Sequence, residues 1–92
     1  MFLDFYFENE KELEELKTII KAQAKIHFAP NEWYYTAEHW GPDRTRIEVN
    51  NSAYFDDLEM AKERFYSEKD YLKDFVSEIK ENLSFVPKIE AK

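Results

Sequence analysis

The chain has no cysteine and only one glycine among its 92 residues. Without cysteine there is no disulfide, no thiolate nucleophile and no zinc site of the usual cysteine-containing kind. Phosphate-binding loops, dinucleotide fingerprints and nucleophile elbows each need several glycines, because the backbone must approach a phosphate closely or adopt a strained turn. These two scarcities therefore exclude the most recognisable catalytic and nucleotide-binding motifs.

Long apolar runs and an excess of basic residues are also missing. No stretch of about 18 apolar residues occurs, so we expect no membrane span and no membrane partner. The segment Met1 to Asp4 has no basic region and carries an acid, so we expect no signal peptide and a cytoplasmic location. The net charge of −7 argues against direct nucleic-acid binding, which needs clustered Lys and Arg. An acidic chain instead suits a basic partner, or is simply soluble.

Groups that could perform chemistry are few. The two histidines, His27 and His39, do not form a pair spaced to place two metal ligands on one helix face. No serine has a histidine near it in sequence, and no pair of carboxylates lies in an environment that must be apolar. We therefore expect no catalytic residue, no metal site and no cofactor, and we predict that the protein is not an enzyme.

Aromatic residues are abundant, at 17% of the chain, and they fall on both sides of strand-like segments. Side chains alternate in direction along a strand. Over Met1 to Phe7 the alternation puts Leu3, Phe5 and Phe7 on one side and Phe2, Asp4 and Tyr6 on the other. The second side is too apolar for an ordinary solvated face, so either a helix covers it or a partner binds there.

The next segment predicts a helix over residues 10–25. Asn9 can cap it, and Glu12 stands three residues later, where a capping-box acid belongs. Acids crowd the first turns and lysines the last, as the helix dipole favours. The apolar stripe is formed by Leu13, Leu16, Ile20 and Ala24. Residues 25–29 are short and apolar and could add a strand.

A hairpin is predicted from residues 32–40 and 45–50, because Pro42 and Asp43 between them suit a type I turn. The expected register pairs Trp40 with Thr45, Glu38 with Ile47 and Thr36 with Val49. It assigns one set to the core: Tyr34, Thr36, Trp40, Thr45, Ile47 and Val49. It assigns the other set to the opposite face: Trp33, Tyr35, His39, Arg46, Glu48 and Asn50.

Two further helices are predicted, over residues 57–66 and 68–83, from the capping pairs Asp56 with Glu59 and Ser67 with Asp70. One long helix through Ser67 is the alternative, and a later helix could cover the aromatic face. Pro87 should end the helical run. We therefore expect a single domain over residues 1–86 and a loose tail over 87–92.

The predicted fold class is α+β: a two-layer domain with an antiparallel sheet of three or four strands and two or three helices. The order is β-α-(β)-β-β-α-α, and Leu16, Ile20, Phe5 and Phe75 should share one core. The optional strand is the one that residues 25–29 could form.

By elimination, the sequence favours a small acidic protein-binding module. Large aromatics and Arg supply most of the energy at interfaces, so the predicted partner-binding residues are Trp33, Tyr35, His39 and Arg46. In composition the chain resembles phage and mobile-element proteins that inhibit host nucleic-acid-binding enzymes, some of them as DNA mimics. That resemblance implies a basic or nucleic-acid-binding protein as the partner. The alternative is a homodimeric structural or accessory subunit, with small-ligand binding less favoured.

Overall fold

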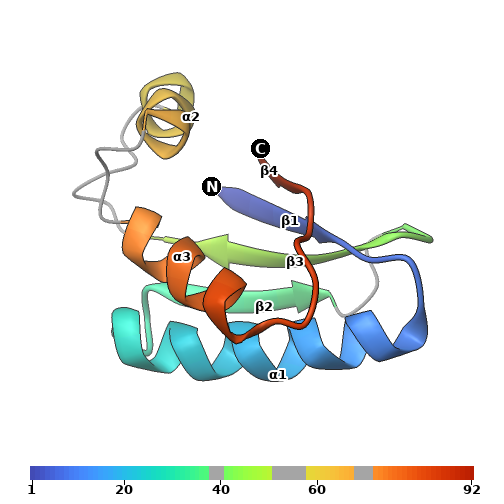
Figure 1. The fold of residues 1–92 in the computed structure, drawn as a ribbon. Coiled ribbons are helices and arrows are strands. Elements are labelled where there is room, and N and C mark those ends of the chain that lie inside the picture. Colours follow the sequence, from blue (N-terminus) through green and yellow to red (C-terminus); the bar gives the residue numbers. More distant parts are fainter. Residues whose placement is uncertain (38–40, 51–57, 68–71) are drawn as a thin grey trace.

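The computed structural model describes residues 1–37, 41–50, 58–67 and 72–92 (Figure 1). In chain order the elements are β1 (Phe2–Tyr6), α1 (Glu10–His27), β2 (Trp33–Ala37), β3 (Arg44–Val49), α2 (Leu58–Tyr66), α3 (Leu72–Asn82) and β4 (Ile89–Ala91). The strands form one antiparallel sheet in the order β2-β3-β1-β4. Helices α1 and α3 lie on the same side of it (Figure 1). The predicted α+β class is confirmed.

The connectivity is that of the split β-α-β, or ferredoxin-like, arrangement. Here the second crossover contains two helices, since α2 ends at Tyr66 and α3 begins at Leu72. The prediction of two helices therefore holds over the single long one. The predicted capping residues Asp56 and Asp70 lie outside the described residues.

Helix α1 begins where the sequence predicted and extends two residues beyond the predicted end. The Asn9 side chain accepts a hydrogen bond from the Glu12 backbone N–H at 2.9 Å. The whole predicted stripe is buried. The helix runs on to His27, and the Phe28 N–H still bonds the Ala24 carbonyl at 2.9 Å. The optional strand over residues 25–29 is therefore wrong: Phe28 instead packs edge-on against Phe75, with ring centroids 4.8 Å apart.

The core fills the space between the helical layer and one face of the sheet. Strand β3 alternates cleanly, with Thr45, Ile47 and Val49 buried between less buried neighbours. The prediction of a shared core is confirmed, because one cluster contains Phe5, Leu16, Ile20 and Phe75 among its fully buried members. Burial of this cluster is the main source of stability in a domain of this size.

The C-terminal residues do not form the loose tail that was predicted. Strand β4 pairs with β1, matching Leu3 with Ala91 and Phe5 with Ile89. This pairing satisfies the backbone groups along the second edge of β1, which would otherwise stay unpaired. On the outer edge of β4, the hydroxyl of Tyr66, the last residue of α2, accepts a hydrogen bond from the Ala91 N–H at 3.0 Å.

The predicted hairpin forms, but its register is wrong. Trp33 lies opposite Val49 and Tyr34 opposite Glu48, and an irregularity follows before Ala37. The prediction had placed Thr36 opposite Val49, a shift of three positions. An odd shift exchanges the two faces of a strand. Trp33 and Tyr35 therefore lie on the core side, packed against the buried cluster.

Candidate functional site

The face of the sheet opposite α1 and α3 carries the most organised group of polar side chains in the part of the chain that is described. Its side chains are set in rows by the strand register, with Asp4 opposite both Arg46 and Glu90, and Tyr6 opposite Arg44. We call this surface the open face. Its members are Phe2, Asp4, Tyr6, Tyr34, Arg44, Arg46, Glu48, Lys88, Glu90 and Lys92.

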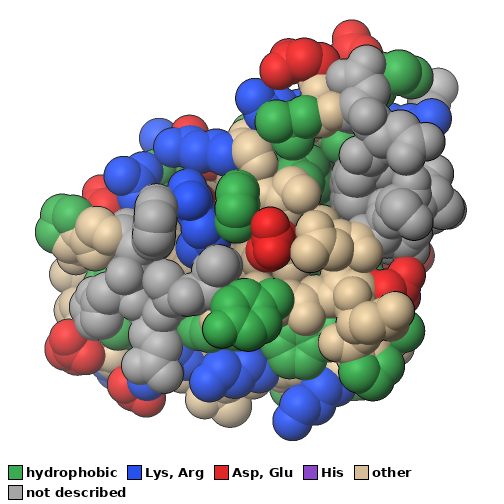
Figure 2. Space-filling model, turned by 180° about the vertical axis from the view of Figure 1, so that it is seen from behind, with side chains coloured by type: hydrophobic (Ala, Val, Ile, Leu, Met, Phe, Trp, Pro, Cys, Tyr) green, Lys and Arg blue, Asp and Glu red, His purple; other side chains and the backbone are tan. Residues whose placement is uncertain are grey.

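Figure 2 looks onto the open face and shows basic side chains gathered in its left half beside hydrophobic ones. Four of its members are basic and three are acidic, so the face is close to neutral in a chain of net charge −7. The remaining excess of acid therefore lies elsewhere on the molecule.

The centre of the open face is a buried ion pair. The Asp4 side chain is 0% exposed, and the Arg46 guanidinium donates to both of its oxygens, at 2.6 and 2.9 Å. The Lys92 ammonium lies 3.8 Å from the same carboxylate. A bidentate pair of this kind fixes both side chains in one geometry. Arg46 also lies over the Phe2 ring, 4.6 Å from its centroid, where the cation attracts the aromatic face.

The next row is built around Tyr6. Its hydroxyl hydrogen-bonds to the Glu90 carboxylate, which raises the pKa of Tyr6 and lowers the pKa of Glu90. Arg44 donates to the same hydroxyl at 2.8 Å, and this bond raises the pKa of the guanidinium. The Lys88 ammonium lies 5.0 Å from the Tyr6 ring centroid and 3.2 Å from Glu90. Each cation of this row thus already has a partner within the protein.

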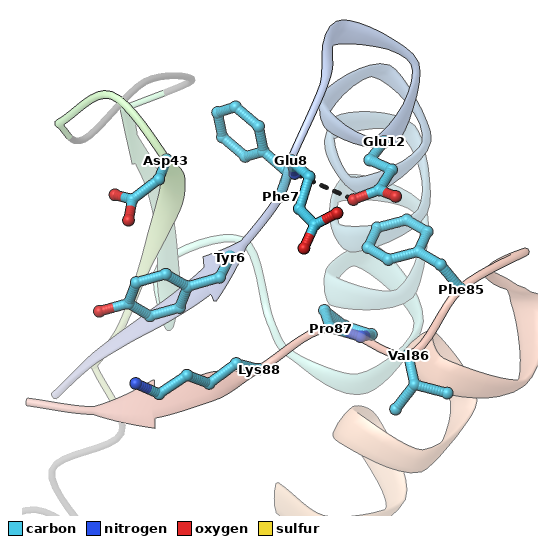
Figure 3. A pocket seen from close by; sticks show the side chains of 9 residues that line it. All are labelled: Tyr6, Phe7, Glu8, Glu12, Asp43, Phe85, Val86, Pro87 and Lys88. Atoms are coloured by element: carbon cyan, nitrogen blue, oxygen red, sulfur yellow. Dashed lines mark hydrogen bonds between the residues drawn. The ribbon is translucent and has the colours of Figure 1, made fainter.

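A groove of about 570 Å³ opens at the end of this face, beside Tyr6 and Lys88 (Figure 3). Its lining combines apolar and acidic side chains. Figure 3 shows Asp43 across the groove from the Phe85 to Pro87 segment, with the Glu8 carboxylate directed toward the space between them. Val86 is 86% exposed, an unusual position for an apolar side chain.

The walls of the groove are fixed by hydrogen bonds from separate segments. The Phe7 N–H bonds the Asp43 carbonyl at 2.9 Å, and the Glu8 N–H bonds the Glu12 carboxylate at 3.0 Å. On the other side, Glu15 accepts from both the N–H and the hydroxyl of Ser84, at 3.0 and 2.7 Å, and these bonds lower the pKa of Glu15. These hydrogen bonds connect the segments that form the two sides of the groove.

The four predicted partner-binding residues do not share one face. Arg46 lies on the open face, as predicted. Trp33 and Tyr35 lie on the helix side, where the Lys21 ammonium is 4.9 Å from the Tyr35 ring centroid and the Tyr35 hydroxyl bonds Thr45. His39 is outside the described residues. A role of any of these residues in binding a partner stays a prediction.

Sequence reasoning placed half of the open face correctly. Phe2, Asp4, Tyr6, Arg46 and Glu48 were assigned to the side away from the core. Tyr34 was assigned to the core, Arg44 to the turn, and Lys88, Glu90 and Lys92 to a loose tail. The alternation of charge with apolar residues in Lys88 to Lys92 is a strand-like signal that was available. The groove residues lie in loops at the ends of elements and give no periodic signal.

No protein-family model, curated protein or solved structure matches this chain. Among the residues that the structure describes, no group of three or more His, Asp or Glu side chains could hold a metal ion. Within the same ranges, no helix combines the length and the apolar character needed to cross a membrane. The fold alone does not indicate a function, because ferredoxin-like connectivity supports many.

Proposed function

We propose that this chain is a protein-binding module and that the open face, with the groove at its end, is where the partner docks. The observation that carries the proposal is the combination of Phe2, Tyr6 and Tyr34 with fixed arginines on the sheet face opposite α1 and α3. Tyr and Arg are the side chains that contribute most at protein interfaces. Because the ion pairs hold them in place, little side-chain entropy is lost on binding.

The pairing of the cations favours a protein over a nucleic acid as the ligand. A phosphate backbone is bound by Lys and Arg that are free to replace its counterions. Here Arg46 and Lys92 are drawn to Asp4, and Lys88 is drawn to Glu90. Releasing them to bind phosphate would leave buried or half-buried carboxylates without a partner. The aromatic side chains of the open face are therefore better suited to bind a polypeptide than a nucleic acid.

The groove and the net charge favour a basic partner. Three carboxylates, those of Glu8, Glu12 and Asp43, line the groove beside the apolar Phe85 and Val86. This lining is complementary to a Lys or Arg side chain, which has an apolar stem and a charged end. A nucleic-acid-binding enzyme is one such basic partner, and this chain would inhibit it by occupying its basic surface.

Imitation of DNA charge has less support from the geometry. Acids on the helices alternate with lysines: Glu14 lies 3.2 Å from Lys17, and Glu59 lies 3.5 Å from Lys62. An array that copies a phosphate backbone would instead present carboxylates without intervening cations. The proposal therefore rests on the open face and the groove, and treats the helical acids as a solvated surface.

The test compares two double variants as baits for affinity capture from a bacterial lysate. Arg44→Ala with Lys88→Ala alters the open face, and Lys11→Ala with Lys80→Ala removes the same charge from α1 and α3. A specific partner should be retained by the parent and the control pair and lost by the open-face pair. Captured proteins that do not distinguish the two pairs would refute the open face as the docking site.

A salt titration of the captured complex then separates two kinds of contact. A partner held mainly by the carboxylates of the groove should be released as ionic strength rises, whereas a partner held by Phe2, Tyr6 and Tyr34 should remain bound. Equal melting temperatures of all baits show that loss of binding does not come from unfolding.

A further inference from the structure

The residues that join the end of α1 to β2 (Figure 1) border a second hollow, of about 610 Å³. Its lining residues are Lys25, Phe28, Pro30, Trp33, Tyr34 and Tyr35. Four of these side chains are aromatic, one is a cation, and none is acidic. The groove beside the open face has the opposite character, because three carboxylates line it. The two cavities therefore favour ligands of opposite charge.

The aromatic walls of the hollow are held in place by contacts with the rest of the domain. Phe28 is 6% exposed and packs edge-on against Phe75. The Tyr35 hydroxyl bonds the fully buried Thr45, and Trp33 packs against the core cluster. Rings that are already fixed lose little conformational entropy when a ligand binds beside them.

Positive charge borders the hollow without a carboxylate to neutralise it. In the described part of the chain, no carboxylate forms an ion pair with Lys25 or with Lys21, one helical turn earlier. The Lys21 ammonium lies 4.9 Å from the centroid of the Tyr35 ring. The nearby acid Glu32 accepts a hydrogen bond from the Ala29 N–H at 2.8 Å and does not line the hollow. An anion that entered the hollow would therefore meet lysine charge and no lining carboxylate.

We propose that this hollow binds a small molecule that carries one anionic group, a carboxylate or a phosphate, on a flat aromatic ring. The aromatic walls contact the ring of the ligand, since aromatic rings pair favourably with one another. Lys25 pairs with the anionic group. The volume lies within the range of about 300–1,000 Å³ that is usual for small-molecule sites, which combine apolar walls with a few polar groups. Tyr34 is 63% exposed, so this wall of the hollow is in contact with solvent and a ligand can enter beside it.

NMR titration of the isotope-labelled full chain with naphthoate tests the proposal. The indole N–H signal of Trp33, identified by its loss in Trp33→Phe, reports on the hollow and should shift with a saturable dependence on concentration. Naphthamide has the same rings without the charge and should bind about fivefold more weakly. Cyclohexanecarboxylate has the charge without an aromatic ring and should also bind more weakly. A parallel titration with naphthyl phosphate shows which of the two anionic groups the site prefers.

A pair of charge-reversal variants tests the role of the lysine. Lys25→Glu places a carboxylate at the hollow and should raise the dissociation constant for naphthoate at least about tenfold. The matched control is Lys11→Glu, the same change on the same helix, about 21 Å away at about 1.5 Å per residue, and it should leave this constant unchanged. The comparison of naphthoate with naphthamide uses the parent chain alone, so it stays decisive even where Lys25→Glu lowers the stability of the fold.

Three results would overturn the proposal. They are the lack of a saturable shift of the Trp33 signal up to about 5 mM naphthoate, equal affinities for naphthoate and naphthamide, and equal affinities of the two lysine variants for naphthoate. Shifts confined to the signals of Arg44 and Arg46 would place the anion on the open face and would equally overturn it. None of these results bears on the docking of a partner protein, because the substituted residues lie outside the open face.

Discussion

Replacing Arg46 by alanine would remove the main partner of a carboxylate that has no contact with solvent. Asp4 is 0% exposed and the Arg46 side chain only 12% exposed, so water cannot take over the two hydrogen bonds without rearrangement of the strands. Breaking a buried pair by removing one member costs roughly 3–5 kcal/mol. The Lys92 ammonium, 3.8 Å from Asp4, compensates in part. We expect a loss near the low end, about 3 kcal/mol.

Urea unfolding followed by circular dichroism measures this loss, provided that the slope with denaturant is unchanged. A loss of about 3 kcal/mol would be a large share of the 5–15 kcal/mol typical of such a domain. Lys92→Ala is the matched control: its ammonium is half exposed and more distant, so its removal should cost less than about 1 kcal/mol. In the double variant Asp4→Leu with Arg46→Met, both charges are absent and most of the stability should return. A loss below about 1 kcal/mol for Arg46→Ala would show that Asp4 is not isolated from water.

Three other predictions concern different parts of the fold. Ile20→Ala should cost about 2–4 kcal/mol in urea melts, because this fully buried side chain lies at the centre of the α1 stripe. Tyr6→Phe removes the hydrogen bond that lowers the pKa of Glu90, so NMR titration should show that pKa rising toward its ordinary value. Because the pKa of Glu90 is lower in the folded parent than in the unfolded chain, its ionised carboxylate stabilises the fold at pH values above the unfolded pKa. This stabilisation is lost as pH falls through the folded pKa. The part of the stability difference between the parent and Tyr6→Phe that comes from Glu90 should therefore vanish in acid. Gly41→Ala should cost about 1 kcal/mol in the same melts, because Gly41 has a φ of +80° that alanine adopts only with strain.

The elements that the sequence predicted well are those in which polar and apolar residues are clearly separated. Helix α1 has one apolar stripe between acids and lysines, and β3 alternates Arg44, Arg46 and Glu48 with Thr45, Ile47 and Val49. In both cases only one orientation buries the apolar side, so the pattern determines which face meets the core.

The register of β2 could not be read in this way, because Trp33, Tyr34 and Tyr35 are all large and aromatic. Either face of such a strand can pack against a core. The predicted core face of this strand therefore depended only on the register that the assumed hairpin turn imposed. The irregularity between Tyr34 and Ala37 shifts the pairing of β2 with β3 away from that of an unbroken hairpin. Strand β4 was missed for another reason: three residues after a proline carry too little pattern, and their strand forms through pairing with β1.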